Sequence, residues 1–304
     1  MLVPGLQVKG NNILKKIKLA LPKGSLQEST FGLFRRAGIK LNVSSRSYFP
    51  ICDDDEIDVM LVRSQEIATY VQDGVFDAGI TGLDWITETN SKVEEVSELI
   101  YAKAGFRPVR WVLAVPEDSK ICSIKDLNGK RIATELVQVV KKYLKVHKVK
   151  SEVVFSWGAT EAKAPSLVDA IVELTETGSS LRANKLKILD EIMSSTTRLI
   201  ANKQIWQKDK DKKKKILDIA LLLKGALASE GMVGLKMNLP EKKLKSILQI
   251  LTALKRPTVS RLTVSGWVAL EVIIDEPTVK KIIPDLIKAG AEGIIEYPLN
   301  KVFL

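Results

Sequence analysis

The chain has 304 residues, of which 45% are hydrophobic and 27% are charged, a composition typical of globular rather than disordered proteins. Such a length predicts two or three domains and a core large enough to fold without disulfides or a structural metal. The two cysteines, Cys52 and Cys122, lie far apart in the sequence, which favours two buried or free thiols in a reducing compartment over one disulfide. The single histidine, His147, sits among lysines, which argues against a zinc site or a histidine-based catalytic triad.

The formal net charge is +11, and much of the excess lies in two lysine-rich segments, Lys141–Lys150 and Lys203–Lys215. We expect both to be solvated, the second as a helix or linker outside the core. A nucleic-acid-binding module is not favoured, because only 6% of the residues are aromatic and single-strand binders stack bases on aromatic side chains. Excess positive charge also attracts small polyanions such as nucleotides and pyrophosphates.

The first residues of the chain contain no signal-peptide pattern, and no run reaches the roughly 18 apolar residues that a membrane span needs. We therefore expect a cytoplasmic protein that does not bind a membrane.

Short apolar runs alternate with segments of helical period over the first two-thirds of the chain, which is typical of α/β proteins. Ile17–Leu21 is predicted to be a buried strand, followed by the turn Pro22-Lys23-Gly24 and a helix that Ser25 caps and Gly38 ends. Further strands are expected at Val59–Val62, Ala78–Thr81, Trp111–Pro116, Arg131–Ala133 and Val153–Phe155, and a further helix at Gln65–Gln72. This order predicts two α/β lobes around a cleft, as in periplasmic binding proteins.

The last quarter of the chain has a different order of elements. Strands are expected at Gly231–Leu239, Thr258–Val264, Trp267–Asp275 and Ile294–Tyr297, and helices at Glu241–Leu251 and Pro277–Ala289. The order βαββαβ predicts a ferredoxin-like domain.

The most informative segment is Asp169–Leu181, in which an apolar run ends in Thr-Glu-Thr-Gly-Ser-Ser before helical periodicity resumes at Leu181. Hydroxyls and unpaired backbone N–H groups at a helix start can bind a phosphate. Glu173 and Glu176 lie just before this loop, where carboxylates can accept hydrogen bonds from ribose hydroxyls. Taken alone, the loop is equally compatible with an ordinary helix cap.

This segment resembles the phosphoribosyl-pyrophosphate signature of the ATP phosphoribosyltransferases, an acidic, apolar run that ends in Thr-Gly-x-Thr-Leu and follows an upstream Glu. Ser180 stands where the family has Thr, Glu173 where it has Asp, and Lys185, beyond the loop, where it commonly has Gly. The matching residues are Glu161, Asp169, Ala170, Ile171, Thr177, Gly178 and Leu181. The residues that the resemblance places at the substrate are Glu161, Asp169, Thr177, Gly178, Ser179, Ser180 and Leu181.

Two further segments are similar to the same family. LALPKGSL resembles its first strand and turn, where Lys23 and Gly24 would face the substrate, although Ser25 replaces the usual Arg. DAGITGLDWI resembles its second signature, which places Gly82 and Asp84 at the cleft. Arg63 and Arg110 are added as candidates for the ATP phosphates.

The C-terminal βαββαβ segment is similar to the regulatory domain of the long-form enzymes, which binds histidine. The residues expected to form that pocket are Pro257, Thr258, Ser260, Leu262, Ala291 and Gly293.

The resemblance implies transfer of the phosphoribosyl group of phosphoribosyl pyrophosphate to N1 of ATP, the first step of histidine synthesis, with histidine as inhibitor. Lys23, Glu173 and Glu176 would be catalytic, Mg²⁺ would arrive with the substrate phosphates, and no dedicated metal site is expected. The chain would form a homodimer or hexamer. The expected parts are a first lobe at 1–107, rejoined by about 190–222, a second lobe at 108–189, and a regulatory domain at 223–304. The main alternative is a non-catalytic, two-lobed small-molecule binding protein.

Overall fold

The computed structural model describes residues 16–103, 105–251 and 257–303. It divides into two compact units, which are described separately below. The N-terminal unit comprises the chain through Arg35 together with Ile39–Ala220, and the C-terminal unit comprises Arg36–Gly38 and the residues from Leu221 onward. Across the described ranges, no helix has the length and apolar character needed to cross a membrane.

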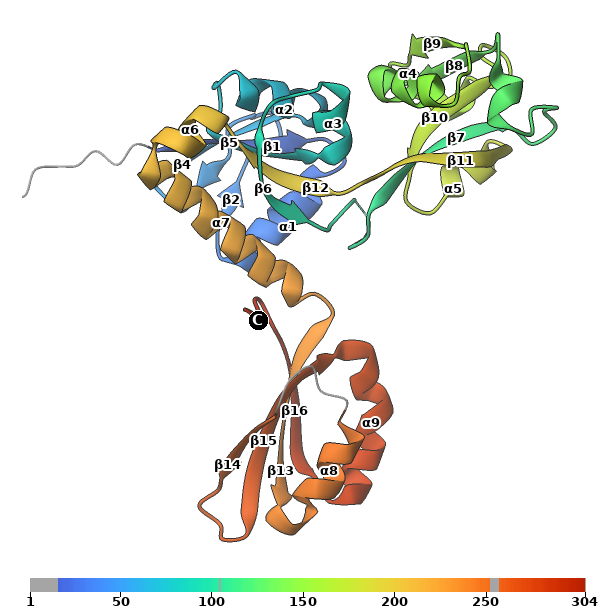
Figure 1. Ribbon diagram of the computed structural model, residues 1–304. Coiled ribbons are helices and arrows are strands. Elements are labelled where there is room, and N and C mark those ends of the chain that lie inside the picture. The colour runs from blue at the N-terminus through green and yellow to red at the C-terminus, as the bar shows by residue number, and fades with distance from the viewer. Residues whose placement is uncertain (1–15, 104, 252–256, 304) are drawn as a thin grey trace, which may run out of the picture. The chain divides into compact units, whose positions relative to one another are not determined.

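The first lobe of the N-terminal unit is built on a five-stranded sheet with the order β4-β1-β5-β12-β6 (Figure 1). Its strands are β1 (Ile17–Lys23), β4 (Ile57–Arg63), β5 (Ala78–Gly82), β6 (Glu94–Leu99) and β12 (Thr197–Ala201). β1 lies parallel to β4 and β5, whereas β12 runs antiparallel to β5 and β6. The buried run of β1 explains its place inside the sheet, between β4 and β5, since a strand covered on both faces needs apolar residues at successive positions.

The helices of this lobe are α1 (Gln27–Ala37), α2 (Ser64–Gln72) and α3 (Leu83–Glu88), and a two-stranded hairpin joins β2 (Leu41–Asn42) to β3 (Ile51–Cys52). α2 buries Ile67, Ala68 and Val71. A Cβ on Gly79 of β5 would lie 2.6 Å from the Ile67 side chain, so glycine at this position lets α2 pack closely on the sheet.

The second lobe has a sheet with the order β11-β7-β10-β8-β9. Its strands are β7 (Val109–Pro116), β8 (Arg131–Thr134), β9 (Glu152–Phe155), β10 (Ala170–Thr175) and β11 (Leu186–Ser195), and its helices are η1 (Ile124–Leu127), α4 (Val137–Val146), η2 (Thr160–Ala162) and α5 (Ser179–Ala183). β8 is parallel to β9 and β10, and β7 is antiparallel to β10 and β11. Both lobes therefore share one plan: three parallel strands, then an antiparallel strand, then an edge strand. The predicted two-lobed α/β fold is confirmed.

The segment after Leu181 differs from the prediction. Helical periodicity was expected to continue, but α5 ends at Ala183 and β11 begins at Leu186. Lys185 has φ +52°, a left-handed conformation that ends a helix. The following residues pair along β7, and this pairing outweighs their local helical pattern.

The lysine-rich run is helical, as α6 (Lys203–Lys208) and the start of α7 (Lys210–Ala228), but part of it does not lie outside the core. Lys212 Nζ lies 2.6 Å from an Asp77 carboxylate oxygen, and both side chains are largely buried. Lys215 pairs with Asp54 at 2.7 Å and with Glu56 at 2.5 Å. These ion pairs tie α7 to the first lobe.

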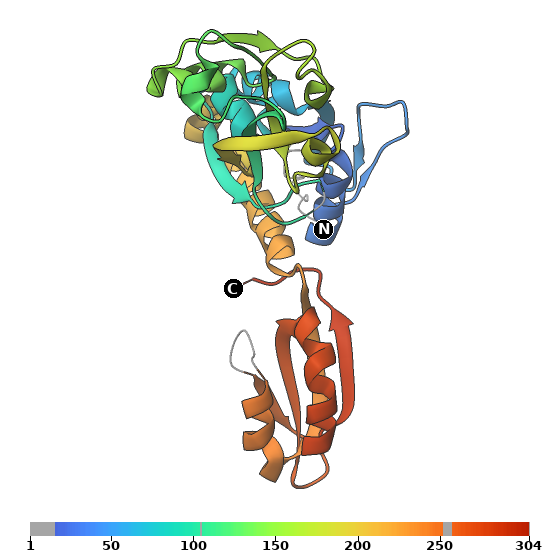
Figure 2. The same cartoon turned by 90° about the vertical axis from the view of Figure 1, so that its right-hand side faces the viewer.

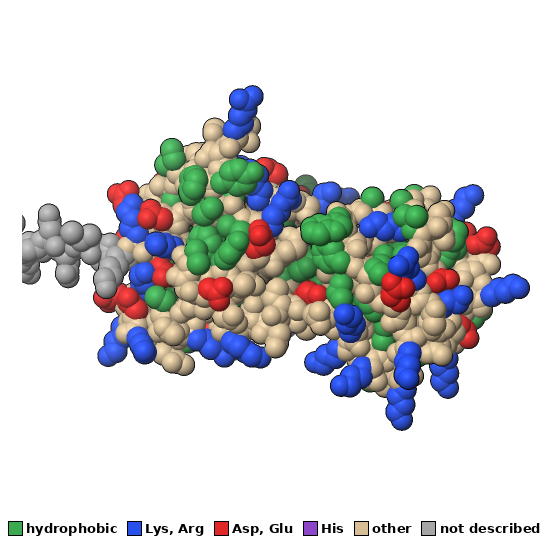
Figure 3. Space-filling model, turned by 90° about the horizontal axis from the view of Figure 1, so that it is seen from above, with side chains coloured by type: hydrophobic (Ala, Val, Ile, Leu, Met, Phe, Trp, Pro, Cys, Tyr) green, Lys and Arg blue, Asp and Glu red, His purple; other side chains and the backbone are tan. Residues whose placement is uncertain are grey.

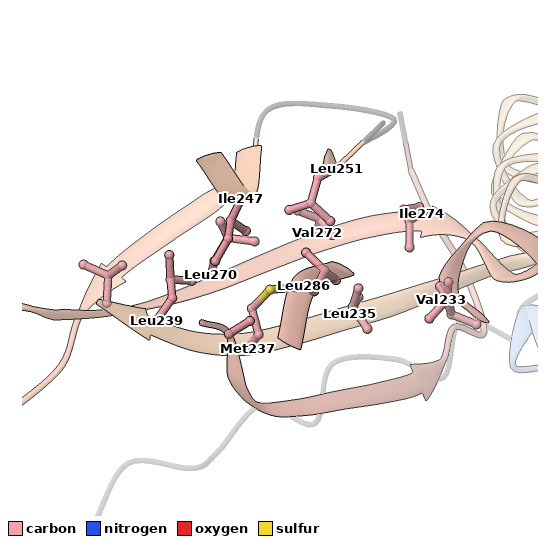
Figure 4. Close-up of a cluster of buried hydrophobic side chains, with 13 residues drawn as sticks. Val233, Leu235, Met237, Leu239, Ile247, Leu251, Leu270, Val272, Ile274 and Leu286 are labelled. Atoms are coloured by element: carbon pink, nitrogen blue, oxygen red, sulfur yellow. The ribbon is translucent and has the colours of Figure 1, made fainter. Parts of the chain in front are cut away.

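The C-terminal unit contains an antiparallel sheet with the order β14-β15-β13-β16, and α8 and α9 cover the same face of it (Figures 1 and 2). Its elements are β13 (Met232–Pro240), η3 (Glu241–Lys243), α8 (Leu244–Ile250), β14 (Thr258–Arg261), β15 (Trp267–Asp275), α9 (Glu276–Ala289) and β16 (Glu292–Pro298). Alternate residues of β13 and β15 form a core with the helices (Figure 4). The predicted ferredoxin-like order is confirmed.

Candidate functional site

Two cations lie side by side at the carboxyl ends of β1 and β4. Lys23 and Arg63 are register partners on these parallel strands, and both line a pocket of about 420 Å³ with Tyr48, Glu66 and Tyr70. The Lys23 ammonium sits over the Tyr48 ring, 4.1 Å from its centroid. Because parallel strands deliver their last residues to one edge of a sheet, this placement follows from the topology.

Gly24 lies between β1 and α1 with φ +115°, a conformation that glycine adopts without strain. A Cβ at this position would be 3.4 Å from Nη1 of Arg63. The turn therefore brings the backbone close to the Arg63 guanidinium.

A second pocket, of about 120 Å³, lies where the two lobes meet. Gly82, Asp84 and Glu176 line it, together with the chain segments that cross between the lobes. The structure thus brings together three of the predicted site residues, two from the end of β5 and the start of α3 in the first lobe and one from the loop after β10 in the second.

Asp84 is 2% exposed, and its carboxylate forms hydrogen bonds that connect the two lobes. Trp111 Nε1, from β7, donates to it at 2.7 Å, and the backbone N–H of Trp85 donates at 3.0 Å. Trp85 and Trp111 pack edge to face with their centroids 6.1 Å apart. Burial raises the pKa of Asp84, although donated hydrogen bonds, including one from Ser195, act in the opposite direction.

Gly82 precedes α3, and a Cβ on it would overlap the Asp84 carboxylate. Because Gly82 has no side chain, the Asp84 carboxylate can lie against the start of α3 and accept the hydrogen bond from the Trp85 N–H.

Two other contacts link the lobes. The Glu88 carboxylate, at the end of α3, accepts hydrogen bonds from the backbone N–H groups of Gln138 at 2.9 Å and Val139 at 3.0 Å. These donors belong to the first turn of α4, where a negative charge is favourable. Gln65 of α2 donates to Glu135, just after β8, at 3.3 Å.

The loop after β10 is held by its own hydrogen bonds. Thr175 Oγ1 accepts from the Gly178 N–H at 2.7 Å, and Gly178, with φ +73°, is the N-cap of α5. The Thr177 hydroxyl donates to Ser179 Oγ at 3.0 Å, and Arg182 donates to the Thr177 carbonyl at 3.1 Å. Thr177, Ser179 and Ser180 are exposed, so their hydroxyls are presented on a turn that is already ordered.

Glu173, on β10, lies mostly inside the second lobe. Burial raises its pKa, and the neighbouring Glu135 and Glu161 raise it further. The hydrogen bond that Glu173 accepts from the backbone N–H of Leu174, at 3.0 Å, acts in the opposite direction.

Three predicted residues have other contacts within the second lobe. Asp169 is at the other end of β10, where it accepts from the Arg131 N–H at 2.9 Å and pairs with Lys130 at 3.4 Å. Leu181 belongs to the core of the second lobe. Arg110 is the register partner of Thr175, but its guanidinium lies 3.4 Å from Glu191.

The predicted regulatory residues do not form one cluster within the chain. Thr258 and Ser260 are on β14, preceded by Pro257 and followed by Leu262, whereas Ala291 and Gly293 are at the start of β16. β14 and β16 are opposite edges of the sheet, with β15 and β13 between them. Ala291 is also part of the core.

Several residues of this region have no sequence signal of their own. Tyr48 reaches Lys23 from the segment between β2 and β3, and Gln65 and Glu135 meet only across the lobes. These residues belong to no periodic pattern and to no motif of fixed spacing, so the sequence alone did not identify them.

The charged side chains bear on two other kinds of site, a nucleic-acid surface and a metal centre. On the face shown in Figure 3, Lys and Arg side chains are scattered, many of them beside acidic ones. Across the described ranges, no group of three or more His, Cys, Asp or Glu side chains is arranged to hold a metal ion.

Comparison with known proteins gives matches over nearly the whole chain. A family model described as ATP phosphoribosyltransferase matches residues 63–225, and one described as HisG, C-terminal domain, matches residues 229–301. The ATP phosphoribosyltransferase of Chlorobium luteolum is 58% identical over 291 residues, 96% of this chain and 99% of that protein. That of Thermodesulfovibrio yellowstonii is 58% identical over 288 residues, 95% of this chain and 98% of that protein.

A solved structure, the ATP phosphoribosyl transferase (HisG:HisZ) complex from Thermotoga maritima, matches with a TM-score of 0.58 and 28% identity, covering 68% of this chain and 98% of that chain. Both family models match in chain order, and the relatives match over almost their full length. The chain therefore belongs to the ATP phosphoribosyltransferase family, pentosyltransferases that carry out the first step of histidine biosynthesis, and it includes the C-terminal domain of that family.

Proposed function

We propose that the chain transfers the phosphoribosyl group of phosphoribosyl pyrophosphate to N1 of ATP. The N1 lone pair forms a bond to ribose C1, the bond from C1 to the pyrophosphate oxygen breaks, and pyrophosphate leaves with that electron pair. The observation that carries this proposal is the Thr177–Ser180 turn, whose hydroxyls are exposed while its backbone is already ordered.

The acidic and cationic groups have separate roles in this proposal. The Thr177–Ser180 turn binds the 5′-phosphate, and Glu173 and Glu176 bind the ribose. Lys23 and Arg63 bind the pyrophosphate and ATP phosphates, since their charges lie together in one pocket. Adenine N1 has a free lone pair at neutral pH, so catalysis rests on positioning and on charge stabilisation of the leaving group rather than on a strong base.

Mg²⁺ enters this scheme bound to the substrate phosphates. Pyrophosphate oxygens and water suit Mg²⁺, which protein sites commonly hold through one or two carboxylates. Glu66, in the same pocket as Lys23 and Arg63, is the residue that would supply one such carboxylate. When bound, the ion would neutralise charge on the departing pyrophosphate.

The first experiment measures pyrophosphate release with ATP, phosphoribosyl pyrophosphate and Mg²⁺, leaving out each in turn. Release that needs all three supports the proposal, and no release from folded protein contradicts it. Replacing both Thr177 and Ser180 by Val should raise KM for phosphoribosyl pyrophosphate about 100-fold or more, because two hydrogen bonds to a charged phosphate are lost. An unchanged KM would remove the loop from its role.

We also propose that L-histidine inhibits the enzyme through the C-terminal unit. The support is the match of this unit to the family's C-terminal domain. Added histidine should suppress pyrophosphate release. Because β14 and β16 are separate edges, Ser260→Ala and Gly293→Ala test the two halves of the predicted pocket independently. Release that ignores histidine would contradict the regulatory role and leave the catalytic one standing.

A further inference from the structure

A lysine that the sequence patterns did not single out, Lys103, lines the pocket of about 120 Å³ where the two lobes meet. It lies between β6 and β7, on a segment that carries the chain from the first lobe to the second. Of the lysines and arginines that the structure describes, only Lys103 lines this pocket. Its ammonium group forms no ion pair with any described acidic residue, so we expect its charge to be available to a ligand.

The backbone next to Lys103 is held by hydrogen bonds to two elements of the first lobe. Tyr101 is 3% exposed, and its hydroxyl lies 2.8 Å from Thr30 Oγ1 of α1. The Tyr101 carbonyl accepts a hydrogen bond from Thr197 Oγ1 of β12 at 2.9 Å. The Lys103 side chain is exposed, but it therefore extends from a backbone segment whose position is fixed.

The same pocket adjoins the groups that the proposed function assigns to the substrate phosphates. Three of its lining residues are close in the chain to such groups: Ser25, two residues after Lys23; Ser64, next to Arg63; and Glu176, next to Thr177. The pocket is thus bordered by the turn assigned to the 5′-phosphate and by the strand ends assigned to the pyrophosphate. The bond that breaks, from ribose C1 to the pyrophosphate oxygen, joins these two ends of the substrate and belongs in this space.

The charge that develops during the reaction requires a cation at this point. As the bond to C1 breaks, its electron pair moves onto the departing oxygen, so negative charge grows there in the transition state. The carboxylates that line the pocket, those of Asp84 and Glu176, cannot stabilise it. A fixed cation stabilises the transition state more than the ground state and so raises the rate.

We propose that Lys103 is a catalytic residue whose ammonium group donates a hydrogen bond to the pyrophosphate at the oxygen that leaves C1. This inference rests on the proposed function, in which Lys23 and Arg63 bind the phosphates farther from C1. The ammonium group keeps its protons throughout, and pyrophosphate leaves with the electron pair of the broken bond.

The test compares Lys103→Met with the unmodified full-length protein in a single turnover, with enzyme in excess over phosphoribosyl pyrophosphate. The rate should fall about 100-fold, as for the loss of one donor to a developing negative charge. KM for phosphoribosyl pyrophosphate should change by less than about threefold, because the interaction strengthens in the transition state. Lys103→Arg, which keeps the charge, should recover most of the lost rate.

Inhibition by added pyrophosphate provides a second measurement, which a purely structural role would not affect. The inhibition constant should rise about tenfold in Lys103→Met, as expected when one hydrogen bond to a charged group is lost. Lys120→Met, which removes an exposed lysine of the second lobe, should change neither the rate nor the inhibition constant.

An unchanged rate with unchanged pyrophosphate inhibition in folded Lys103→Met would overturn the proposal, as would a loss of rate that Lys103→Arg does not relieve. Should Lys103→Met fail to fold, Lys103→Gln, which keeps a polar side chain without the charge, allows the same comparison. These outcomes differ from failure of the proposed function, in which the unmodified protein itself releases no pyrophosphate.

Discussion

The two lobes of the N-terminal unit share a sheet plan but present different chemistry at corresponding strand ends. In the first lobe, β1 and β4 end in two cations, the half-buried Lys23 and the exposed Arg63. In the second, the corresponding strands β8 and β9 lead to Glu135 and to the buried hydroxyl of Ser156. The sheet topology determines where the side chain at a strand end lies, whereas the residue type determines what that side chain can bind.

The lobes also differ in how their charged groups are held. Lys23 and Arg63 line a pocket, so we expect them to be available to a ligand. Glu173 and the loop after β10 are hydrogen-bonded within the protein before any ligand arrives. We therefore expect substitutions in the first lobe's pocket to affect phosphate binding, and those in the second lobe to affect orientation and protonation.

The largest effect is expected when the first lobe loses its cations. Replacing both Lys23 and Arg63 by Met should lower kcat/KM by about 10³-fold, the loss expected for two charge-assisted contacts to phosphates. Lys40→Met, which removes an exposed lysine elsewhere in the lobe, is the control. Initial rates of pyrophosphate release measure the effect, and a loss below tenfold would contradict the assignment of this pocket.

A second large effect concerns stability of the first lobe. Lys212→Met leaves the buried Asp77 carboxylate with the Lys18 N–H, 2.9 Å away, but without its cation, and should cost about 3–5 kcal/mol of unfolding free energy. Lys214→Met, at an exposed position of the same helix, should cost little. Combining Lys212→Met with Asp77→Asn should recover part of the loss. Denaturant unfolding tests all three, and equal losses for Lys212 and Lys214 would contradict the buried role.

An intermediate effect is expected where the lobes join. Asp84→Asn retains one acceptor for Trp111 Nε1 but loses the other carboxylate oxygen, which should cost about 1–3 kcal/mol. Because Trp111 packs on Trp85, tryptophan fluorescence reports any change at this junction.

The same variant has a predicted pH dependence. Burial raises the pKa of folded Asp84 above the value of about 4 in the unfolded chain. The folded state then binds more protons than the unfolded state between these two values, so the stabilisation from this group is lost as pH rises through the folded pKa. The stability difference between the natural chain and Asp84→Asn should widen as pH falls toward about 4, and a difference independent of pH would contradict the raised pKa.

The smallest effect tests the other contact between the lobes. Glu88→Gln removes the negative charge at the start of α4 and should cost about 0.5–1 kcal/mol, less at high salt. Glu117→Gln, an exposed change in the second lobe, is the matched control. Melting temperatures at low and high salt measure both, and a salt-independent loss would show that the charge is not responsible.

The sequence by itself determined the two-lobed α/β class, the ferredoxin-like order of the C-terminal unit and the turn at Thr177–Ser180. These features depend on residues close together in the chain, through apolar periodicity and local turn chemistry. The same local patterns failed after Leu181, where a left-handed Lys185 and pairing with β7 replace the expected helix by a strand.

Only the tertiary structure decided which polar groups meet. It buried Asp84 against Trp111, paired Lys212 with Asp77 across 135 positions of sequence, and placed Asp169 at the far end of β10 from the loop. It also set the predicted regulatory residues on opposite edges of a sheet. The physical reason is that a buried charge needs a specific partner, and strand order, which no local pattern encodes, decides which distant residue that partner is.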